Sequence, residues 1–90
     1  MSTFFDNCTL KQKSEIDIKQ RFGKAIRRRR RELDLSQEHL AEISGLHRTY
    51  ISSIERGQRN PSLENIENLT KALDISISAL FANYGIEVEE

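Results

Sequence analysis

The sequence is poor in the residue types that mark disulfide-stabilised, metal-binding or membrane proteins. It contains one cysteine, one proline and no tryptophan. Cys8 cannot form an internal disulfide or supply a metal site alone, which fits a reducing compartment. No apolar run approaches the roughly 20 residues that cross a bilayer, and residues 1–10 lack the basic and apolar regions of a signal peptide. We therefore expect a cytoplasmic protein without a membrane span.

The chain also lacks the size and the side-chain sets of an enzyme. Ninety residues support one hydrophobic core, so a two-domain enzyme is not expected. The two histidines, His39 and His47, have no cysteine, aspartate or second histidine at a ligand spacing. We therefore expect no catalytic residue, no metal, no cofactor and no small-molecule ligand.

The formal net charge is zero, but the charges are segregated along the chain. Residues 1–59 contain 13 Lys and Arg against 8 Asp and Glu, a net charge of +5. Residues 60–90 contain 1 against 6, a net charge of −5. A basic part of the surface can therefore face phosphates while an acidic part points elsewhere.

Apolar residues recur at helical intervals along most of the chain. This periodicity predicts a first helix over residues 15–33, which Asp34 ends because aspartate tolerates a left-handed backbone. A second helix begins at the N-cap Ser36 and runs to Gly45. A third helix occupies residues 47–56 and is polar outside one narrow apolar seam.

The second half of the chain continues the helical pattern. Residues 57–61 contain glycine and proline and form a turn. Ser62 caps a fourth helix, which ends at Asp74, and a final short helix starts at Ser76. Because no β-type alternation occurs before the last few residues, the expected class is all-α, a compact bundle of five short helices.

Three parts of the chain differ in their expected order. Residues 15–84 form the helical domain. Residues 1–14 show no sustained periodicity and are compatible with a loose N-terminal arm or with a short extra helix. Residues 85–90 form an acidic tail, and we expect its residues 87–90 to fray.

The second and third predicted helices can form a helix-turn-helix, because Gly45 supplies a tight turn between them. Ala41 is small enough to let the two helices approach closely, and Leu40, Ile51 and Ile54 would fill the space between them. The outer face of the third helix is polar. Such a helix can enter the major groove of DNA.

The stretch over residues 35–57, LSQEHLAEISGLHRTYISSIERG, resembles the helix-turn-helix of the Cro and Xre-like phage repressor family. The matching positions are Gln37, Ala41, Gly45, Ile51, Ile54, Glu55 and Gly57. The resemblance extends through NPSLENIENLTKAL to Phe81. Within the family, GLHRTYISSIERG is similar to the controller proteins of restriction–modification systems, small dimeric regulators that time expression of the endonuclease gene.

The resemblance implies a sequence-specific, DNA-binding transcriptional regulator. It implies a homodimer on a two-fold symmetric operator of double-stranded DNA, with half-sites roughly 34–36 Å apart, and a controller that regulates its own gene. The alternative is an antitoxin, or a phage or chromosomal repressor, with a protein partner.

The resemblance also implies which residues face DNA. The positions from which the family contacts base edges hold Arg48, Thr49, Ser52 and Ser53. Arg48 is the strongest candidate, because a guanidinium that donates to both O6 and N7 of guanine contributes about 1–3 kcal/mol of discrimination. Contacts to the DNA backbone, which position the protein without reading sequence, are expected from Gln37, His47, Tyr50, Arg56, Arg59 and Asn60.

The arginines of residues 27–31 cannot all touch DNA. A helix turns about 100° per residue, so at most two or three of them share a face. By the resemblance, Arg30 forms a structural ion pair with Glu55. Arg29 stands where the family has an apolar residue, and we expect its stem to pack while its charged end reaches solvent. Asp34 replaces a common glycine.

Dimerisation needs a further surface, and in the family the last helices meet across the two-fold axis. The candidates for this interface are Ile75, Ile77, Leu80, Phe81 and Tyr84. Burial in the core of the monomer is the alternative for each of them. A domain of this size should not expose many such residues alone, which supports at least a weak dimer.

Overall fold

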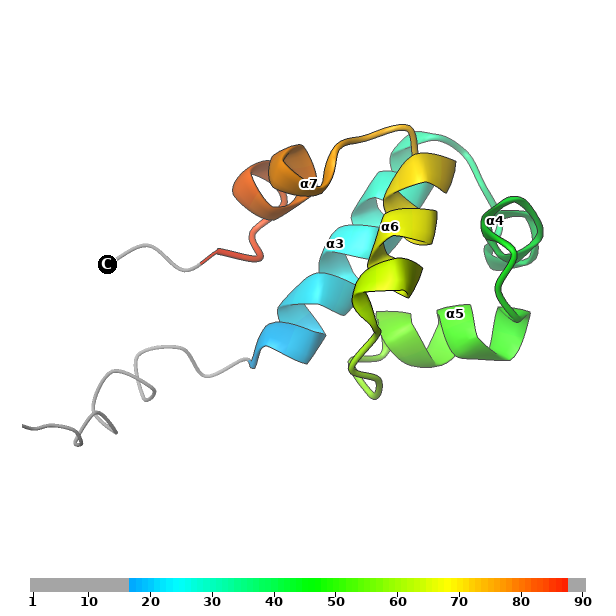
Figure 1. Ribbon diagram of the computed structural model, residues 1–90, viewed down its shortest axis with the longest axis horizontal. Coiled ribbons are helices and arrows are strands. Elements are labelled where there is room, and N and C mark those ends of the chain that lie inside the picture. The colour runs from blue at the N-terminus through cyan, green and yellow to red at the C-terminus, as the bar shows by residue number, and fades with distance from the viewer. Residues whose placement is uncertain (1–16, 88–90) are drawn as a thin grey trace, which may run out of the picture.

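The computed structural model describes residues 17–87, and within this range it contains five helices and no strand (Figure 1). The helices are α3 (Ile18–Glu32), α4 (Gln37–Ser44), α5 (Arg48–Glu55), α6 (Leu63–Ala72) and α7 (Ile77–Asn83). The predicted all-α bundle is confirmed. The predicted N-terminal arm, residues 1–14, lies outside the described residues, as does Cys8.

Each helix except α5 begins with a side-chain cap. The hydroxyl oxygens of Ser36, Ser62 and Ser76 accept a hydrogen bond from the backbone N–H three residues later, at 2.9, 3.1 and 3.0 Å. Asp17 caps α3 in the same way, at 3.0 Å. The predicted serine caps are confirmed, and such caps are typically worth about 1 kcal/mol each. The N-cap of α5 is His47, which makes no side-chain capping bond.

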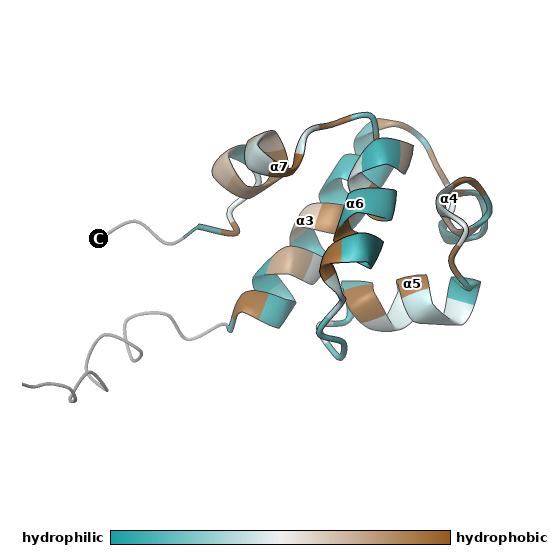
Figure 2. Cartoon of the chain, viewed as in Figure 1, coloured by the Kyte–Doolittle hydropathy of each residue, from teal (hydrophilic) through white to brown (hydrophobic). Residues whose placement is uncertain are grey.

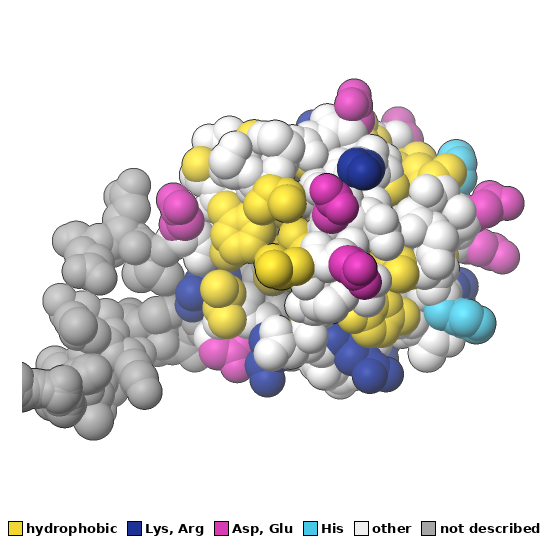
Figure 3. All heavy atoms as spheres, viewed as in Figure 1, with side chains coloured by type: hydrophobic (Ala, Val, Ile, Leu, Met, Phe, Trp, Pro, Cys, Tyr) yellow, Lys and Arg dark blue, Asp and Glu magenta, His cyan; other side chains and the backbone are white. Residues whose placement is uncertain are grey.

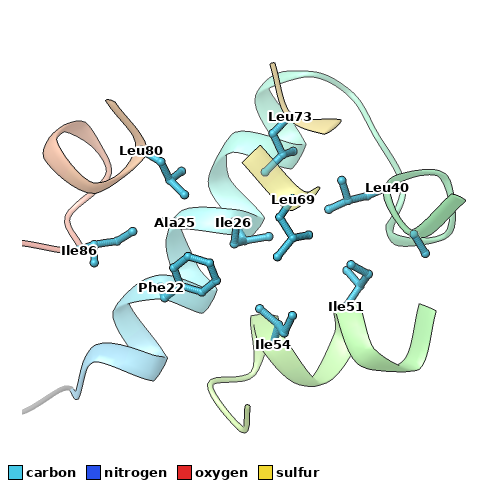
Figure 4. Packing of buried hydrophobic residues seen from close by; sticks show 11 residues of the cluster. Phe22, Ala25, Ile26, Leu40, Ile51, Ile54, Leu69, Leu73, Leu80 and Ile86 are labelled. Atoms are coloured by element: carbon cyan, nitrogen blue, oxygen red, sulfur yellow. The ribbon is translucent and has the colours of Figure 1, made fainter. Parts of the chain in front are cut away.

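The helices pack so that α5 contacts both α3 and α4, while α6 contacts α4 and α7. Figure 2 shows that α6 is mainly hydrophilic on the side toward the viewer and that α5 carries both hydrophobic and hydrophilic positions. The fully buried large side chains point toward one another in the centre (Figure 4). They are Ile26, Leu40, Ile51, Ile54, Leu69, Leu73, Leu80 and Ile86.

The chain remains packed beyond the expected end of the domain at residue 84. Ile86 is buried in the core. Its carbonyl oxygen accepts a hydrogen bond of 2.7 Å from Nε of Arg21 on α3. The packed part of the molecule therefore includes Ile86, which we had expected to belong to the acidic tail.

Arg29 lies on the core-facing side of α3, but its charged end does not simply reach solvent. Its Nε donates to the carbonyl oxygen of Leu73 at 2.9 Å, and its Nη2 donates to that of Asp74 at 3.0 Å. The last carbonyls of a helix lack partners within that helix. Arg29 therefore caps the end of α6, which explains why a charged residue fits a position that the family keeps apolar.

Tyr84 joins the end of α3 to the residues that follow α7. Its hydroxyl donates to a carboxylate oxygen of Glu32, and its ring lies 4.9 Å from the guanidinium carbon of Arg28. The hydrogen bond from Tyr84, and after it the charges of Arg28 and Arg29, lower the pKa of Glu32. Because the pKa is lowered in the folded state, this contribution to stability is present above the unfolded pKa and is lost as the pH falls through the folded value.

Asp34 has a φ of 58°, in the left-handed region. We expect Asp34→Gly to raise the free energy of unfolding by about 0.5–1 kcal/mol, because relief of the strained backbone exceeds the extra entropy of glycine in the unfolded chain. Asp34→Ala should lower it by a similar amount. Urea unfolding of both variants measures the difference. Equal stabilities of the glycine and alanine variants would show that the backbone angle costs nothing here.

Candidate nucleic-acid interface

One side of α5 holds the helix in the protein, and the other carries the predicted base-contacting residues. Ile51 and Ile54 are buried in the core. Arg48 and Thr49 are exposed and Ser52 is half-buried. At about 100° per residue, Arg48, Ser52 and Thr49 fall within one third of the helix circumference, away from the core. The structure therefore brings three of the four predicted residues together on one polar face.

Ser53 does not belong to this face. Only 5% of its surface is exposed. Its hydroxyl lies 3.0 Å from the carbonyl oxygens of both Thr49 and Tyr50, and it accepts a hydrogen bond of 3.2 Å from Nε of Arg59. The rotation of α5 on the core turns Ser53 inward, so we remove it from the set of base-contacting residues.

Tyr50 and Arg59 hold the turn after α5 in place. The guanidinium carbon of Arg59 lies 5.5 Å from the centre of the Tyr50 ring. The Tyr50 hydroxyl accepts a hydrogen bond of 3.1 Å from the amide of Asn65 on α6. Tyr50 is half-buried and packs against the core. Asn60, in the same turn, is exposed.

The carboxylate of Glu55 connects α3, α4 and α5. Its side chain is completely buried. Arg30 donates to it twice, from Nε at 2.7 Å and from Nη2 at 3.0 Å, so the predicted ion pair is present in the structure. The amide of Gln37, at the start of α4, donates to the same carboxylate at 2.9 Å. Arg30 also donates to the carbonyl oxygen of Leu35 at 2.8 Å. These bonds fix the orientation of α5 relative to both neighbouring helices.

The two ends of α5 leave polar groups available. His47, at its N-terminus, is exposed. No side chain caps the first backbone N–H groups of α5, and such groups favour anions. Arg56 follows α5 and donates to the hydroxyl of Ser52 and to the amide oxygen of Gln58, both of them neutral partners.

The predicted dimer residues differ in how deeply they are buried. Leu80 is fully buried in the core of the monomer, so it cannot contribute a face to a partner. Ile75, Phe81 and Tyr84 are partly buried against the core, and Ile77 is 42% exposed. The sequence pattern missed Leu63, which is 82% exposed although its spacing in α6 resembles that of core residues.

The described part of the chain contains neither a metal-binding cluster nor a helix that could cross a membrane. Within residues 17–87, no group of three or more His, Cys, Asp or Glu is placed to hold a metal ion. No helix in this range is both long and apolar enough to cross a bilayer.

A short α4, the glycine turn at Gly45 and an α5 with a polar outer face define a helix-turn-helix DNA-binding protein. The helix-turn-helix family model matches residues 26–80, and the chain belongs to this family. It is 47% identical over 75 residues to the control protein C.SmaI of Serratia marcescens. The aligned stretch spans 83% of this chain and 89% of the relative.

Solved structures agree with this family. The crystal structure of the restriction-modification controller protein C.AhdI from Aeromonas hydrophila matches with a TM-score of 0.68 and 51% identity, over 70% of this chain and 96% of that one. The controller protein C.Esp1396I, crystallised as a tetramer in complex with its natural 35 base-pair operator, matches with a TM-score of 0.69 and 37% identity, over 74% of this chain and 88% of that one.

Proposed function

We propose that this protein is the controller of a restriction–modification system, a homodimeric regulator that binds a two-fold symmetric operator beside its own gene. The observation that carries the proposal is the polar face of α5, with Arg48, Thr49 and Ser52 directed away from a core that holds the helix rigidly. The similarity to controller proteins over most of both chains supports the same role. We place this activity in the cytoplasm.

In this proposal Arg48 and Thr49 contact base edges in the major groove. Arg48 stands at the first position of α5, where a positive charge opposes the helix dipole. Within residues 17–87 it forms no ion pair. Its guanidinium is therefore available for guanine O6 and N7, and Thr49 adds a hydroxyl donor or a methyl contact to thymine.

Contacts to the DNA backbone are assigned to both ends of α5. At the N-terminal end, we assign these contacts to His47 and to the uncapped backbone N–H groups of α5. Gln37 donates one amide hydrogen to Glu55 and can donate its second to a phosphate. At the other end of α5, we assign contacts with the DNA backbone to Arg56, Arg59 and Asn60. Such contacts fix the register of the protein on DNA without reading sequence.

For the dimer, we propose an interface on the side of α6 and α7. Figure 3 shows hydrophobic side chains in a continuous area on this side of the molecule. The proposed contacts are the exposed Ile77 and Leu63 and the partly buried Ile75, Phe81 and Tyr84.

Footprinting on the DNA immediately upstream of the protein's own gene tests the function. We expect a protected region with two-fold symmetry and half-sites about 10 base pairs apart, or a multiple of that spacing. Neighbouring genes for an endonuclease and a methyltransferase would agree with a controller, whereas a toxin gene would indicate an antitoxin. Absence of protection by folded protein would exclude autoregulation through this site.

Arg48→Ala should weaken binding to the operator by about 1–3 kcal/mol and leave binding to random duplex almost unchanged. The reason is that a base contact contributes to specific complexes only. Titration of both duplexes measures the effect. As a control, Arg31→Ala removes an exposed arginine of α3 and should not change the ratio of the two affinities. Equal losses on both duplexes for Arg48→Ala would exclude its role in base recognition.

A further inference from the structure

A groove between α3 and the end of α5 is lined mainly by cations and amides. It has a volume of about 440 Å³. It is lined by Gln20, Lys24 and Arg27 of α3, by Glu55 at the end of α5, and by Arg56 and Gln58 after α5. None of the residues predicted to contact DNA, apart from Arg56, lies in this groove.

Carboxylates do not neutralise all of the positive charge in the groove. Within residues 17–87, neither Lys24 nor Arg56 forms an ion pair. Arg27 Nε lies 3.6 Å from Glu55, and its side chain is 41% exposed. The charge of Glu55 is already compensated by the two hydrogen bonds from Arg30. Three cationic groups therefore remain able to bind an anion.

The groove is fixed relative to α5. Gly57, at the start of the turn after α5, packs so closely on α3 that a Cβ at this position would lie 2.7 Å from Cγ of Gln20. Arg56 directly follows the last residue of α5. An anion in the groove would therefore lie next to the end of the helix that contacts bases in the proposed function. Figure 3 shows cationic side chains along the lower edge of the molecule, near α5, and carboxylates over α6.

We infer that this groove binds a phosphate of the DNA backbone just outside the bases that α5 contacts, with Lys24 and Arg27 donating from one wall and Arg56 from the other. The inference rests on the proposed function. A phosphodiester has only acceptor oxygens, which suit an ammonium and two guanidinium groups. The side-chain amides of Gln20 and Gln58 can donate to the same group.

Lys24→Gln provides the test, because Lys24 is exposed and its replacement leaves the core and the Glu55 network unchanged. Binding is measured between 50 and 200 mM salt on the operator found by footprinting, extended by ten flanking base pairs on each side. Loss of one phosphate contact per protomer should reduce the salt dependence by about 0.9 per contact, or about 1.8 for a dimer. The affinity advantage of the wild type over the variant should then shrink about tenfold over this salt range.

Two controls make the result specific. Lys71→Gln removes an exposed lysine at the end of α6, outside the groove, and should leave the salt dependence unchanged. On a duplex that ends at the outer edges of the half-sites, Lys24→Gln and wild type should bind with similar salt dependence. Melting temperatures verify that each variant is folded.

The outcomes separate this inference from the function on which it rests. If wild type binds the long operator and Lys24→Gln shows the same salt dependence, the phosphate groove is wrong and the proposed function stands. A Lys24→Gln variant that binds DNA normally but loses an acidic protein partner would assign the groove to that protein instead. If wild type binds no operator, the proposed function and the groove fail together.

Discussion

Arg30→Met is expected to lower the free energy of unfolding by about 3–5 kcal/mol, because it leaves a buried carboxylate without its main partner. The Glu55 side chain is inaccessible to solvent. Without Arg30, its remaining partners are the Gln37 amide at 2.9 Å and Arg27 at 3.6 Å. The carboxylate would have to remain poorly compensated or take up a proton, and either change costs stability. Urea unfolding followed by circular dichroism measures the loss.

Two variants control for this result. Arg31→Met removes the next arginine, which is exposed, and should change stability by no more than about 0.5 kcal/mol. The double variant Arg30→Met with Glu55→Leu replaces the ion pair by apolar groups and should recover most of the loss. A single Arg30→Met variant as stable as the wild type would show that this pair does not hold α5 in place.

Gly23→Ala is expected to destabilise the fold by about 3 kcal/mol, at the upper end of the range for overpacking. A Cβ on Gly23 would lie 2.3 Å from the carbonyl oxygen of Ile54 and 2.9 Å from that of Glu55. Both atoms belong to the backbone of α5, so no flexible side chain can move aside. The helices α3 and α5 would have to separate, and the polar face of α5 would move with them.

The sign of the stability change distinguishes close packing from helix propensity. Alanine in the middle of an exposed helix is about 1 kcal/mol more favourable than glycine, so helix propensity alone predicts a more stable variant. Lys19→Ala, at an exposed position of the same helix, serves as the control for general effects of alanine on α3. Chemical unfolding of both proteins decides between close packing and propensity. A Gly23→Ala variant at least as stable as wild type would refute the close approach of the two helices.

The sequence by itself determined the local features of this protein. The serine caps Ser36, Ser62 and Ser76 lie where a side-chain oxygen meets the amide three residues later, an interaction that needs no distant contact. The left-handed backbone at Asp34 and at Gly45 likewise follows from the neighbouring residues. Helical periodicity was sufficient to predict the class and the order of the helices.

Only the tertiary structure decided how these helices are rotated and what their polar groups contact. Ser53 points inward because Ile51, Ile54 and Glu55 together set the rotation of α5. Serine occurs on both buried and exposed faces of helices, so the sequence does not indicate which way this residue points. Arg29 donates to carbonyl groups that lie 44 and 45 residues away in the sequence. Because every residue has a backbone carbonyl, the sequence pattern does not indicate which of them accepts such a bond. The groove lined by Lys24 and Arg27 also depends on tertiary packing. Its walls come from α3 and from the turn after α5, and only packing at Gly23 and Gly57 brings them together.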